Sequence, residues 1–196
     1  MALLRALLLR LIAVAVSAIP VQAPAAATPG DDTYTAEEIV DAGHRFFGEI
    51  SGGLASLVER AVARYGLPNG YVIGQEGSGA FFGGLRYGDG VLYTKAEGRR
   101  QVYWQGPSIG WDVGGDGDRT MMLVYNLPNM LAIHRRYVGV AGSAYLVGGL
   151  GMTVLANNEV PERTVYVVPI RSGVGARLGI NVGYLKFTPA PTWNPF

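Results

Sequence analysis

Strand-forming character is clearest in GINVGY, residues 179–184, where Ile180, Val182 and Tyr184 alternate with smaller or polar residues. A period of two places alternate side chains on opposite faces of a strand. The same character recurs from Asn69 onward, and further strands are expected at 71–75, 80–87, 91–95, 101–105, 108–113, 120–127, 144–155 and 164–170. Turn signals separate these strands, at residues 88–90, 114–117 and 157–158.

Glycine is concentrated in the same part of the chain. All 29 glycines lie after Ala27, and most are interleaved with Val, Ile, Leu, Phe and Tyr. Glycine weakens a strand unless its missing side chain relieves crowding, and strands that coil around a narrow interior create such crowding. Many short strands at regular spacing predict a sandwich or a barrel. We therefore expect a mainly β fold, a closed barrel, with a short Pro-led helix at 128–137.

Two helices are expected ahead of the strands. Thr35 and Glu38 have the spacing of a capping box, in which each side chain accepts a hydrogen bond from the other residue's backbone. Gly52-Gly53 ends this first helix. One face of the second helix, at about 54–65, carries Leu54, Leu57, Val58, Ala61 and Val62. Because both helices have apolar faces to cover, we expect them to pack on the barrel.

The N-terminus has the pattern of a secretory signal peptide. Arg5 and Arg10 interrupt an otherwise apolar start, and small residues follow Pro20 at two candidate cleavage sites, 21–23 and 25–27. The apolar run is shorter than the ~20 residues of a membrane-spanning helix, although an uncleaved anchor remains open. We expect a signal peptide at 1–27, a flexible leader at 28–34 and a single barrel domain at 35–196, with its helices at 35–66. The expected location is the periplasm.

Composition narrows the classes of partner. The chain has no cysteine, which excludes both disulfides and a cysteine-linked lipoprotein anchor. Without Arg5 and Arg10, 14 basic residues remain against 15 acidic residues. This balance argues against a nucleic-acid-binding surface and against a strongly basic membrane patch. No stable membrane insertion is expected after signal cleavage, because no other apolar run is long enough.

Five blocks of the sequence are similar to one known family. They are QEGSGAFFGGLRYG (75–88), YWQGPSIG (103–110), RTMMLVYNL (119–127), GSAYLVGG (142–149) and PIRSGVGARLG (169–179). Together they resemble the envelope integrity protein A family of alphaproteobacterial periplasmic proteins. The resemblance implies a soluble eight-stranded β-barrel that supports resistance to envelope stress, without catalytic activity. No cofactor is expected, and the strand list above is one longer than such a barrel needs.

Two sequence patterns suggest catalysis or nucleotide binding, but neither has the required context. Residues 106–110 fit the G-x-S-x-G pattern around Ser108, yet the residues that follow are typical of strand and turn rather than of the helix that a nucleophile elbow requires. The glycine-rich segments 77–83 and 173–179 have a spacing similar to that of phosphate-binding loops, but neither opens a helix. We therefore expect no catalytic residues and no nucleotide.

Metal binding is not expected either. The two histidines, His44 and His134, have no carboxylate or cysteine neighbours at metal-ligand spacing and are interpreted as partly exposed surface residues. The aspartates Asp112, Asp116 and Asp118 cluster at a turn, but no bidentate acid follows to close a calcium loop.

Aromatic residues and two arginines are the candidates for ligand binding. The aromatic candidates are Tyr103, Trp104, Trp111, Tyr125 and Tyr145. They form either a packed core or a groove for a lipid or glycan, because an eight-stranded barrel has room for its own side chains or for one small ligand, not both. Arg119 and Arg171 are each expected to open a strand at a barrel mouth, where a guanidinium can hold a phosphate or carboxylate. Their alternative role is pairing with Asp116 or Glu162.

The expected function is that of a non-enzymatic periplasmic protein that supports cell-envelope integrity. Its expected partner is a lipid, lipopolysaccharide-related or glycan ligand, or an envelope protein. An outer-membrane β-barrel is the first alternative, since Phe196 is aromatic and C-terminal. Three prolines within 188–196 oppose it, because proline does not fit a central ladder. A periplasmic serine hydrolase is the second alternative.

Overall fold

The computed structural model describes residues 30, 32–79, 85–107, 118–157, 159, 163–172, 183–194 and 196. The signal peptide, the strand expected at 108–113 and the turn expected at 114–117 lie outside the described residues. Of the stretch 179–184, only residues 183 and 184 are described. Among the helices in the described part of the chain, none combines the length and apolar character of a membrane span.

Both predicted N-terminal helices form, but the first ends at the C-cap Gly48 and not at Gly52-Gly53. Helix α1 (Ala36–Phe47) begins at the capping box: the Thr35 hydroxyl accepts from the backbone N–H of Glu38 at 3.2 Å, and the Glu38 carboxylate accepts from the backbone N–H of Thr35 at 2.7 Å. A 3₁₀ segment, η1 (Gly48–Gly53), leads into α2 (Leu54–Tyr65). The start of α1 and both ends of α2 were predictable because caps and helix-ending glycines act locally.

The strands close into a barrel. They are β1 (Gly70–Gly79), β2 (Leu85–Thr94), β3 (Gly98–Pro107), β4 (Asp118–Tyr125), β5 (Arg136–Gly139), β6 (Tyr145–Val147), β7 (Leu150–Met152), β8 (Leu155–Asn157), β9 (Val165–Ser172) and β10 (Tyr184–Thr188). The order β4-β1-β2-β3-β10-β5-β8-β9, with a further β4–β9 pairing, forms a closed ring of antiparallel strands. Strands β7 and β8 pair with successive parts of β9, and β6 forms a hairpin with β7. The expected eight-stranded barrel is confirmed.

Two of the expected strand boundaries are wrong. Residues 88–90 are not a turn but lie within β2, which pairs with β1 and β3 along its whole length. The strand expected at 144–155 is broken by Gly148 and Gly149, whose φ values of 56° and 82° are left-handed. These glycines form a two-residue hairpin turn that sets Val147 opposite Leu150. Of the helix expected at 128–137, only the 3₁₀ segment η3 (Met130–Ile133) is helical, and residues 136 and 137 belong to β5.

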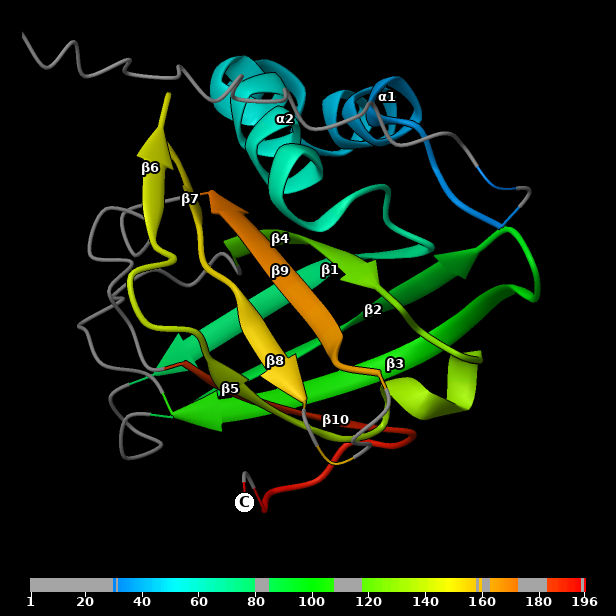
Figure 1. The fold of residues 1–196 in the computed structure, drawn as a ribbon. Coiled ribbons are helices and arrows are strands. Elements are labelled where there is room, and N and C mark those ends of the chain that lie inside the picture. The colour runs from blue at the N-terminus through cyan, green and yellow to red at the C-terminus, as the bar shows by residue number, and fades with distance from the viewer. Residues whose placement is uncertain are drawn as a thin grey trace, which may run out of the picture.

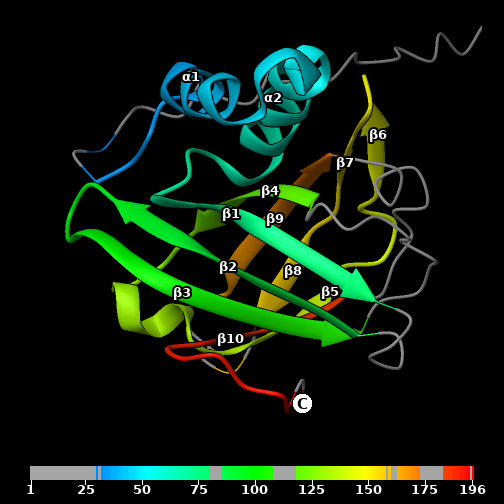
Figure 2. The same cartoon turned by 180° about the vertical axis from the view of Figure 1, so that it is seen from behind.

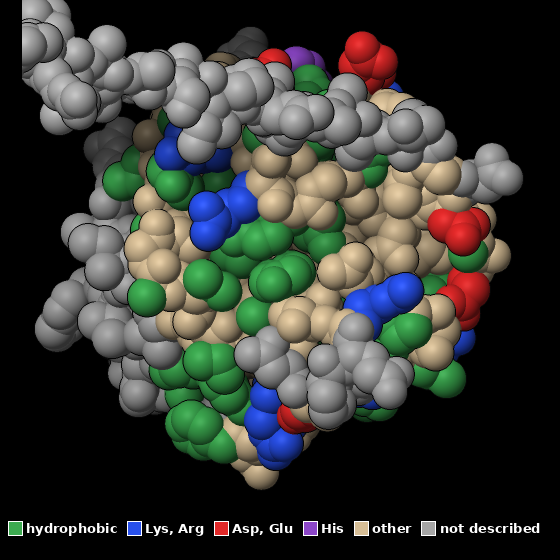
Figure 3. All heavy atoms as spheres, viewed as in Figure 1, with side chains coloured by type: hydrophobic (Ala, Val, Ile, Leu, Met, Phe, Trp, Pro, Cys, Tyr) green, Lys and Arg blue, Asp and Glu red, His purple; other side chains and the backbone are tan. Residues whose placement is uncertain are grey.

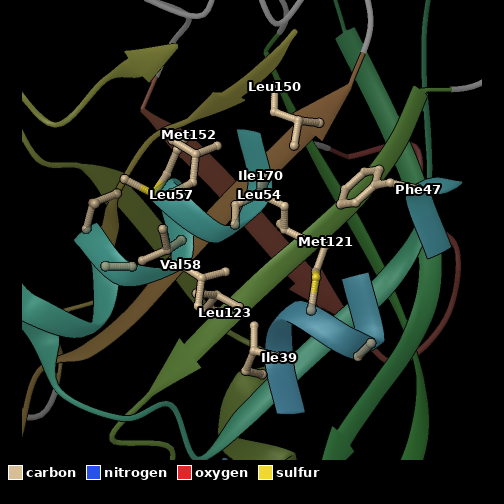
Figure 4. Packing of buried hydrophobic residues seen from close by; sticks show 14 of the residues in the cluster. Ile39, Phe47, Leu54, Leu57, Val58, Met121, Leu123, Leu150, Met152 and Ile170 are labelled. Atoms are coloured by element: carbon tan, nitrogen blue, oxygen red, sulfur yellow. The ribbon is translucent and has the colours of Figure 1, made fainter. Parts of the chain in front are cut away.

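The described residues form two hydrophobic cores because β4 and its neighbours bury side chains on both faces. The first fills the barrel and includes Val72, Leu92, Val102, Trp104, Met122, Val124, Tyr137, Val167, Leu185 and Phe187. The second lies between the helices and the outside of the barrel. Figure 4 shows Ile39, Phe47, Leu54, Leu57 and Val58 of the helical segment packing against Met121, Leu123, Leu150, Met152 and Ile170. In β4, Met121 and Leu123 therefore face the helices while Met122 faces the barrel interior.

The helices and the C-terminus lie on opposite sides of the barrel. Figure 1 and Figure 2 show α1 and α2 above the strands and the C-terminus below them, beyond β10. The chain reaches α1 along the barrel: the backbone N–H of Tyr34 donates to Pro68 O at 2.8 Å, and the Tyr34 ring packs edge-on against Tyr71. Tyr34, the last residue of the predicted leader, therefore packs on the barrel.

Candidate functional site

A carboxylate and two guanidiniums lie inside the barrel near one of its ends. Glu76 is on the inward face of β1, in phase with Val72. Arg86, at the second position of β2, and Arg171, at the last position but one of β9, bind its carboxylate there. At this end of the barrel β1 and β3 end and β2 begins (Figure 1). We call it the Glu76 end.

Three side chains donate hydrogen bonds to the Glu76 carboxylate. Arg171 donates from Nε to Oε1 at 2.9 Å and from Nη2 to Oε2 at 3.3 Å, a bidentate arrangement. Trp104 donates from Nε1 to Oε2 at 2.8 Å, and Arg86 donates from Nη1 to Oε1 at 3.4 Å. The side chain of Glu76 is 7% exposed, and those of Arg86 and Arg171 are 8% and 16% exposed. The three charged side chains are therefore largely shielded from water, and Arg171 is the most exposed of them.

Glu76 is ionised at neutral pH. Burial by itself would raise the pKa of its carboxyl, because a poorly solvated site disfavours the charged form. The charges of Arg171 and Arg86, together with the hydrogen bonds from Arg171 and Trp104, outweigh burial and lower that pKa to about 2. Among these described groups, one negative charge therefore faces two positive charges, since arginine stays protonated in proteins.

Two glycines make room for the indole ring that reaches Glu76. Gly88 is directly opposite Glu76 in the β1–β2 pairing and opposite Trp104 in the β2–β3 pairing. A Cβ at Gly88 would overlap the indole of Trp104, and a Cβ at Gly74 would lie 2.8 Å from its Cη2 atom. The ring therefore lies flat over strand positions without side chains. This packing explains the glycine at position 88 within β2, whereas a Cβ at Gly90 would instead meet the backbone of Ile73 in the neighbouring strand.

The aromatic candidates do not gather in one groove. Trp104 lies at the Glu76 carboxylate, whereas its neighbour Tyr103 is on the opposite, outer face of β3. Tyr125 is buried on the outer face of β4, with its ring 5.7 Å from that of Tyr65 in α2. Tyr145 belongs to the β6–β7 hairpin, where the guanidinium of Arg60 lies 3.6 Å from its ring centre. Trp111 lies outside the described residues.

The two arginine candidates have different partners. Arg119, near the start of β4 as expected, is outside the barrel interior and donates from Nη1 to the carbonyls of Phe46 at 3.1 Å and Phe47 at 3.4 Å. These carbonyls belong to the end of α1, where backbone acceptors lack helical donors. Arg171 does not open a strand but lies near the end of β9, and it pairs with Glu76. The alternative partners Asp116 and Glu162 lie outside the described residues.

Sequence reasoning missed Glu76 and Arg86, although a signal for each was present. Glu76 falls in phase with Val72 on the apolar face of its strand, and Arg86 falls in phase with Leu92. A charge in phase with buried aliphatic residues requires a buried partner of opposite charge. The sequence did not indicate which residues those partners are, because they come from three other strands.

The cluster offers fixed charges rather than a group that exchanges protons at neutral pH. A carboxyl with so low a pKa is a weak base, and guanidiniums do not release protons at neutral pH. The described residues contain no group of three or more His, Asp or Glu that could hold a metal ion. His44 is exposed and His134 is half-buried, while Ser108 lies outside the described residues. Guanidiniums at strand ends are instead suited to bind phosphate or carboxylate groups.

Comparisons with known proteins agree with this architecture. The family model of envelope integrity protein A, EipA, matches residues 32–196. A crystal structure of a β-barrel-like, uncharacterized protein from Brucella abortus has 59% sequence identity and a TM-score of 0.76, and the match covers 84% of this chain and 99% of that chain. A search of curated proteins finds no match. Because the family model spans the helices and the strands of the barrel, the chain belongs to the EipA family. The name of this family associates its members with integrity of the cell envelope.

Proposed function

We propose that this chain is a non-enzymatic periplasmic protein that supports envelope integrity by binding a lipid or glycan component of the envelope at the Glu76 end of its barrel. Family membership supports the role in the envelope. The signal-peptide pattern at 1–27 supports the periplasmic location. The main support for the binding site is that two inward guanidiniums, those of Arg86 and Arg171, share one buried carboxylate.

The structure favours the end of the barrel over its centre as the binding site. In the described part of the chain the interior is filled by its own side chains, among them Trp104, Tyr137 and Phe187. An eight-stranded barrel filled in this way has little room for an internal ligand. Arg171 is partly exposed and is held in place by two hydrogen bonds to Glu76. A fixed guanidinium loses little conformational entropy when it binds a phosphate or carboxylate of a lipid or glycan.

The outer-membrane alternative is disfavoured by the position of the helices. Helices α1 and α2 cover the outer surface of β4 and β9, through Ile39, Leu57 and Met121 among other residues. A membrane-spanning barrel would present that surface to lipid. Release of the protein by osmotic shock is expected, and heat-modifiable migration in a membrane fraction would contradict this interpretation.

Deletion of the gene is expected to sensitise cells to detergent, EDTA and cell-wall antibiotics, and a soluble periplasmic copy should restore resistance. The matched control is Ser108→Ala, which should restore resistance as fully as the unaltered copy if the protein is not a serine hydrolase. Loss of rescue by Ser108→Ala with an unchanged circular dichroism spectrum would revive the hydrolase alternative. Normal resistance of the deletion strain would contradict the envelope role.

Arg171→Lys is expected to abolish ligand retention while leaving the barrel folded. Lysine keeps a positive charge near Glu76 but lacks the planar set of donors of a guanidinium. A guanidinium can hold the Glu76 carboxylate on one side and bind a phosphate or carboxylate of the ligand on another. The measurement is mass spectrometry of lipids and glycans extracted from protein purified from its native periplasm. Arg60→Lys, at the Tyr145 ring, is the control and should retain the same molecules. Equal enrichment in both variants would move the ligand site away from the Glu76 end.

A further inference from the structure

The segment that follows β10 folds back against the outside of the barrel. Lys186, on the outer face of β10, donates from Nζ to Asn194 O at 3.3 Å and to Phe196 O at 2.5 Å. Tyr87 of β2 donates its hydroxyl to Trp193 O at 3.2 Å, and the two rings lie 5.5 Å apart, edge to face. Trp193 and Phe196 are therefore held against the barrel by their own backbone.

Despite this anchoring, the apolar side chains here face solvent. Trp193 is 75% exposed, Phe196 is 63% exposed, and Val138 of β5 is 60% exposed. Val138 is directly opposite Tyr184 in the β5–β10 pairing, and the Tyr184 ring lies 6.0 Å from that of Phe196. Large apolar side chains held in solvent-exposed positions on one surface are typical of an interaction site.

Positive charge accompanies these apolar side chains. Arg136 and Lys186 are directly opposite each other in the same β5–β10 pairing, on the same face as Val138 and Tyr184. Strand β5, strand β10 and the described residues that follow β10 contain no Asp or Glu. The ammonium of Lys186 is bonded to backbone oxygens of the tail, so Arg136 is the more exposed of the two cations. Figure 3 shows hydrophobic and basic side chains side by side at the lower edge of the molecule, with one acidic side chain next to them, where Figure 1 shows the C-terminus. We define the tail patch as Val138, Tyr184, Trp193, Phe196, Arg136 and Lys186.

We propose that the tail patch docks on the surface of a bilayer that contains anionic phospholipid. Aromatic rings next to Lys and Arg suit the boundary between headgroups and acyl chains, where the rings enter the apolar layer and the cations remain at the phosphates. The overall charge of the chain is close to neutral, so the attraction comes from this local grouping. The patch is on the side of the barrel away from the helices (Figure 1, Figure 2), and docking leaves the second core intact.

The proposal is tested by flotation of the protein, purified from its native periplasm, with vesicles of phosphatidylcholine and phosphatidylglycerol. We expect binding that falls as salt rises, because the cations contribute. The double variant Trp193→Ala with Phe196→Ala should bind roughly tenfold more weakly. Arg136→Glu should weaken binding to the anionic vesicles by a similar factor and change binding to pure phosphatidylcholine little. Circular dichroism should report the same fold for every variant.

Leu146→Ala is the matched control, because Leu146 is 55% exposed on β6, beside the helices and away from the tail patch (Figure 1). It should bind vesicles as the unaltered protein does. The proposal is overturned if the protein binds no vesicles, if the double variant binds normally, or if Leu146→Ala weakens binding equally. Arg171→Lys, the variant that tests the Glu76 end, should bind vesicles as the unaltered protein does, so either proposal can fail without the other.

Discussion

Glu76→Gln is expected to lower the free energy of unfolding by about 3–5 kcal/mol at pH 7, the range found when one partner is removed from a buried ion pair. The variant leaves the guanidiniums of Arg86 and Arg171 inside the barrel without their shared carboxylate. The amide that replaces the carboxylate accepts hydrogen bonds through only one oxygen and carries no charge. Thermal or urea unfolding measures the loss, which corresponds to a fall in Tm of roughly 10 °C.

The difference in free energy of unfolding between the unaltered protein and Glu76→Gln should shrink as the pH falls. The pKa of Glu76 is lowered from 4.5 to about 2 by folding, so the folded state binds its proton less readily than the unfolded state does. The stabilisation is therefore complete above the unfolded pKa and is lost as pH falls through the folded pKa. The unfolding free energies of the two proteins should converge between about pH 4.5 and pH 2. Other carboxyl groups titrate in both proteins and largely cancel in the difference.

Glu38→Gln is the matched control for this prediction. Glu38 pairs with Lys95 at 2.9 Å, but both side chains are substantially exposed. Solvent screens such a pair, and glutamine can still complete the capping box with Thr35. The expected loss is therefore below about 1 kcal/mol. A comparable loss in both variants, or a Glu76→Gln effect that does not shrink on acidification, would contradict a stabilising role for the buried cluster.

The helices and the barrel class were predictable because their signals are local or repeated. The capping box at Thr35 and the helix-ending glycines act within a few residues, and the alternation of apolar side chains recurs in strand after strand. The Gly-Asp-Gly sequence at 88–90 was not predictable in this way. Gly88 makes room for the ring of Trp104 and Gly90 for the backbone of Ile73, and both neighbours come from other strands.

The candidate site was predictable only in part, for a geometric reason. Tyr103 and Trp104 are adjacent in one strand, so they cannot line the same face. That rule separates these two candidates but does not place Tyr125 or Tyr145, which belong to other strands. The role of Trp104 depends on Glu76, 28 residues away, and that of Arg171 depends on the same carboxylate, 95 residues away. Pairings across a barrel follow from strand register, which one sequence does not specify.

Gly88→Ala is expected to destabilise the barrel by about 3 kcal/mol or more, through overpacking and through loss of a charged hydrogen bond. The new Cβ would overlap the indole of Trp104, which is fully buried. Moving the ring away would break its 2.8 Å hydrogen bond to Glu76. Urea unfolding gives the loss, and the near-ultraviolet circular dichroism of the native state reports the displaced tryptophan.

Gly77→Ala is the control, since a Cβ at Gly77 meets no atom within 4 Å and its φ is not left-handed. There alanine should leave stability unchanged or raise it by up to ~1 kcal/mol, because it reduces the freedom of the unfolded chain. If the indole is the cause of the Gly88→Ala effect, Trp104→Phe should cost less in the Gly88→Ala background than in the unaltered protein. In the Gly88→Ala background the smaller ring relieves the overlap, and the hydrogen bond to Glu76 is already broken. The cost of Trp104→Phe should therefore differ between the two backgrounds by at least about 1 kcal/mol. Additive losses would mean that Gly88 is required for the backbone of β2 and not for the ring that reaches the buried carboxylate.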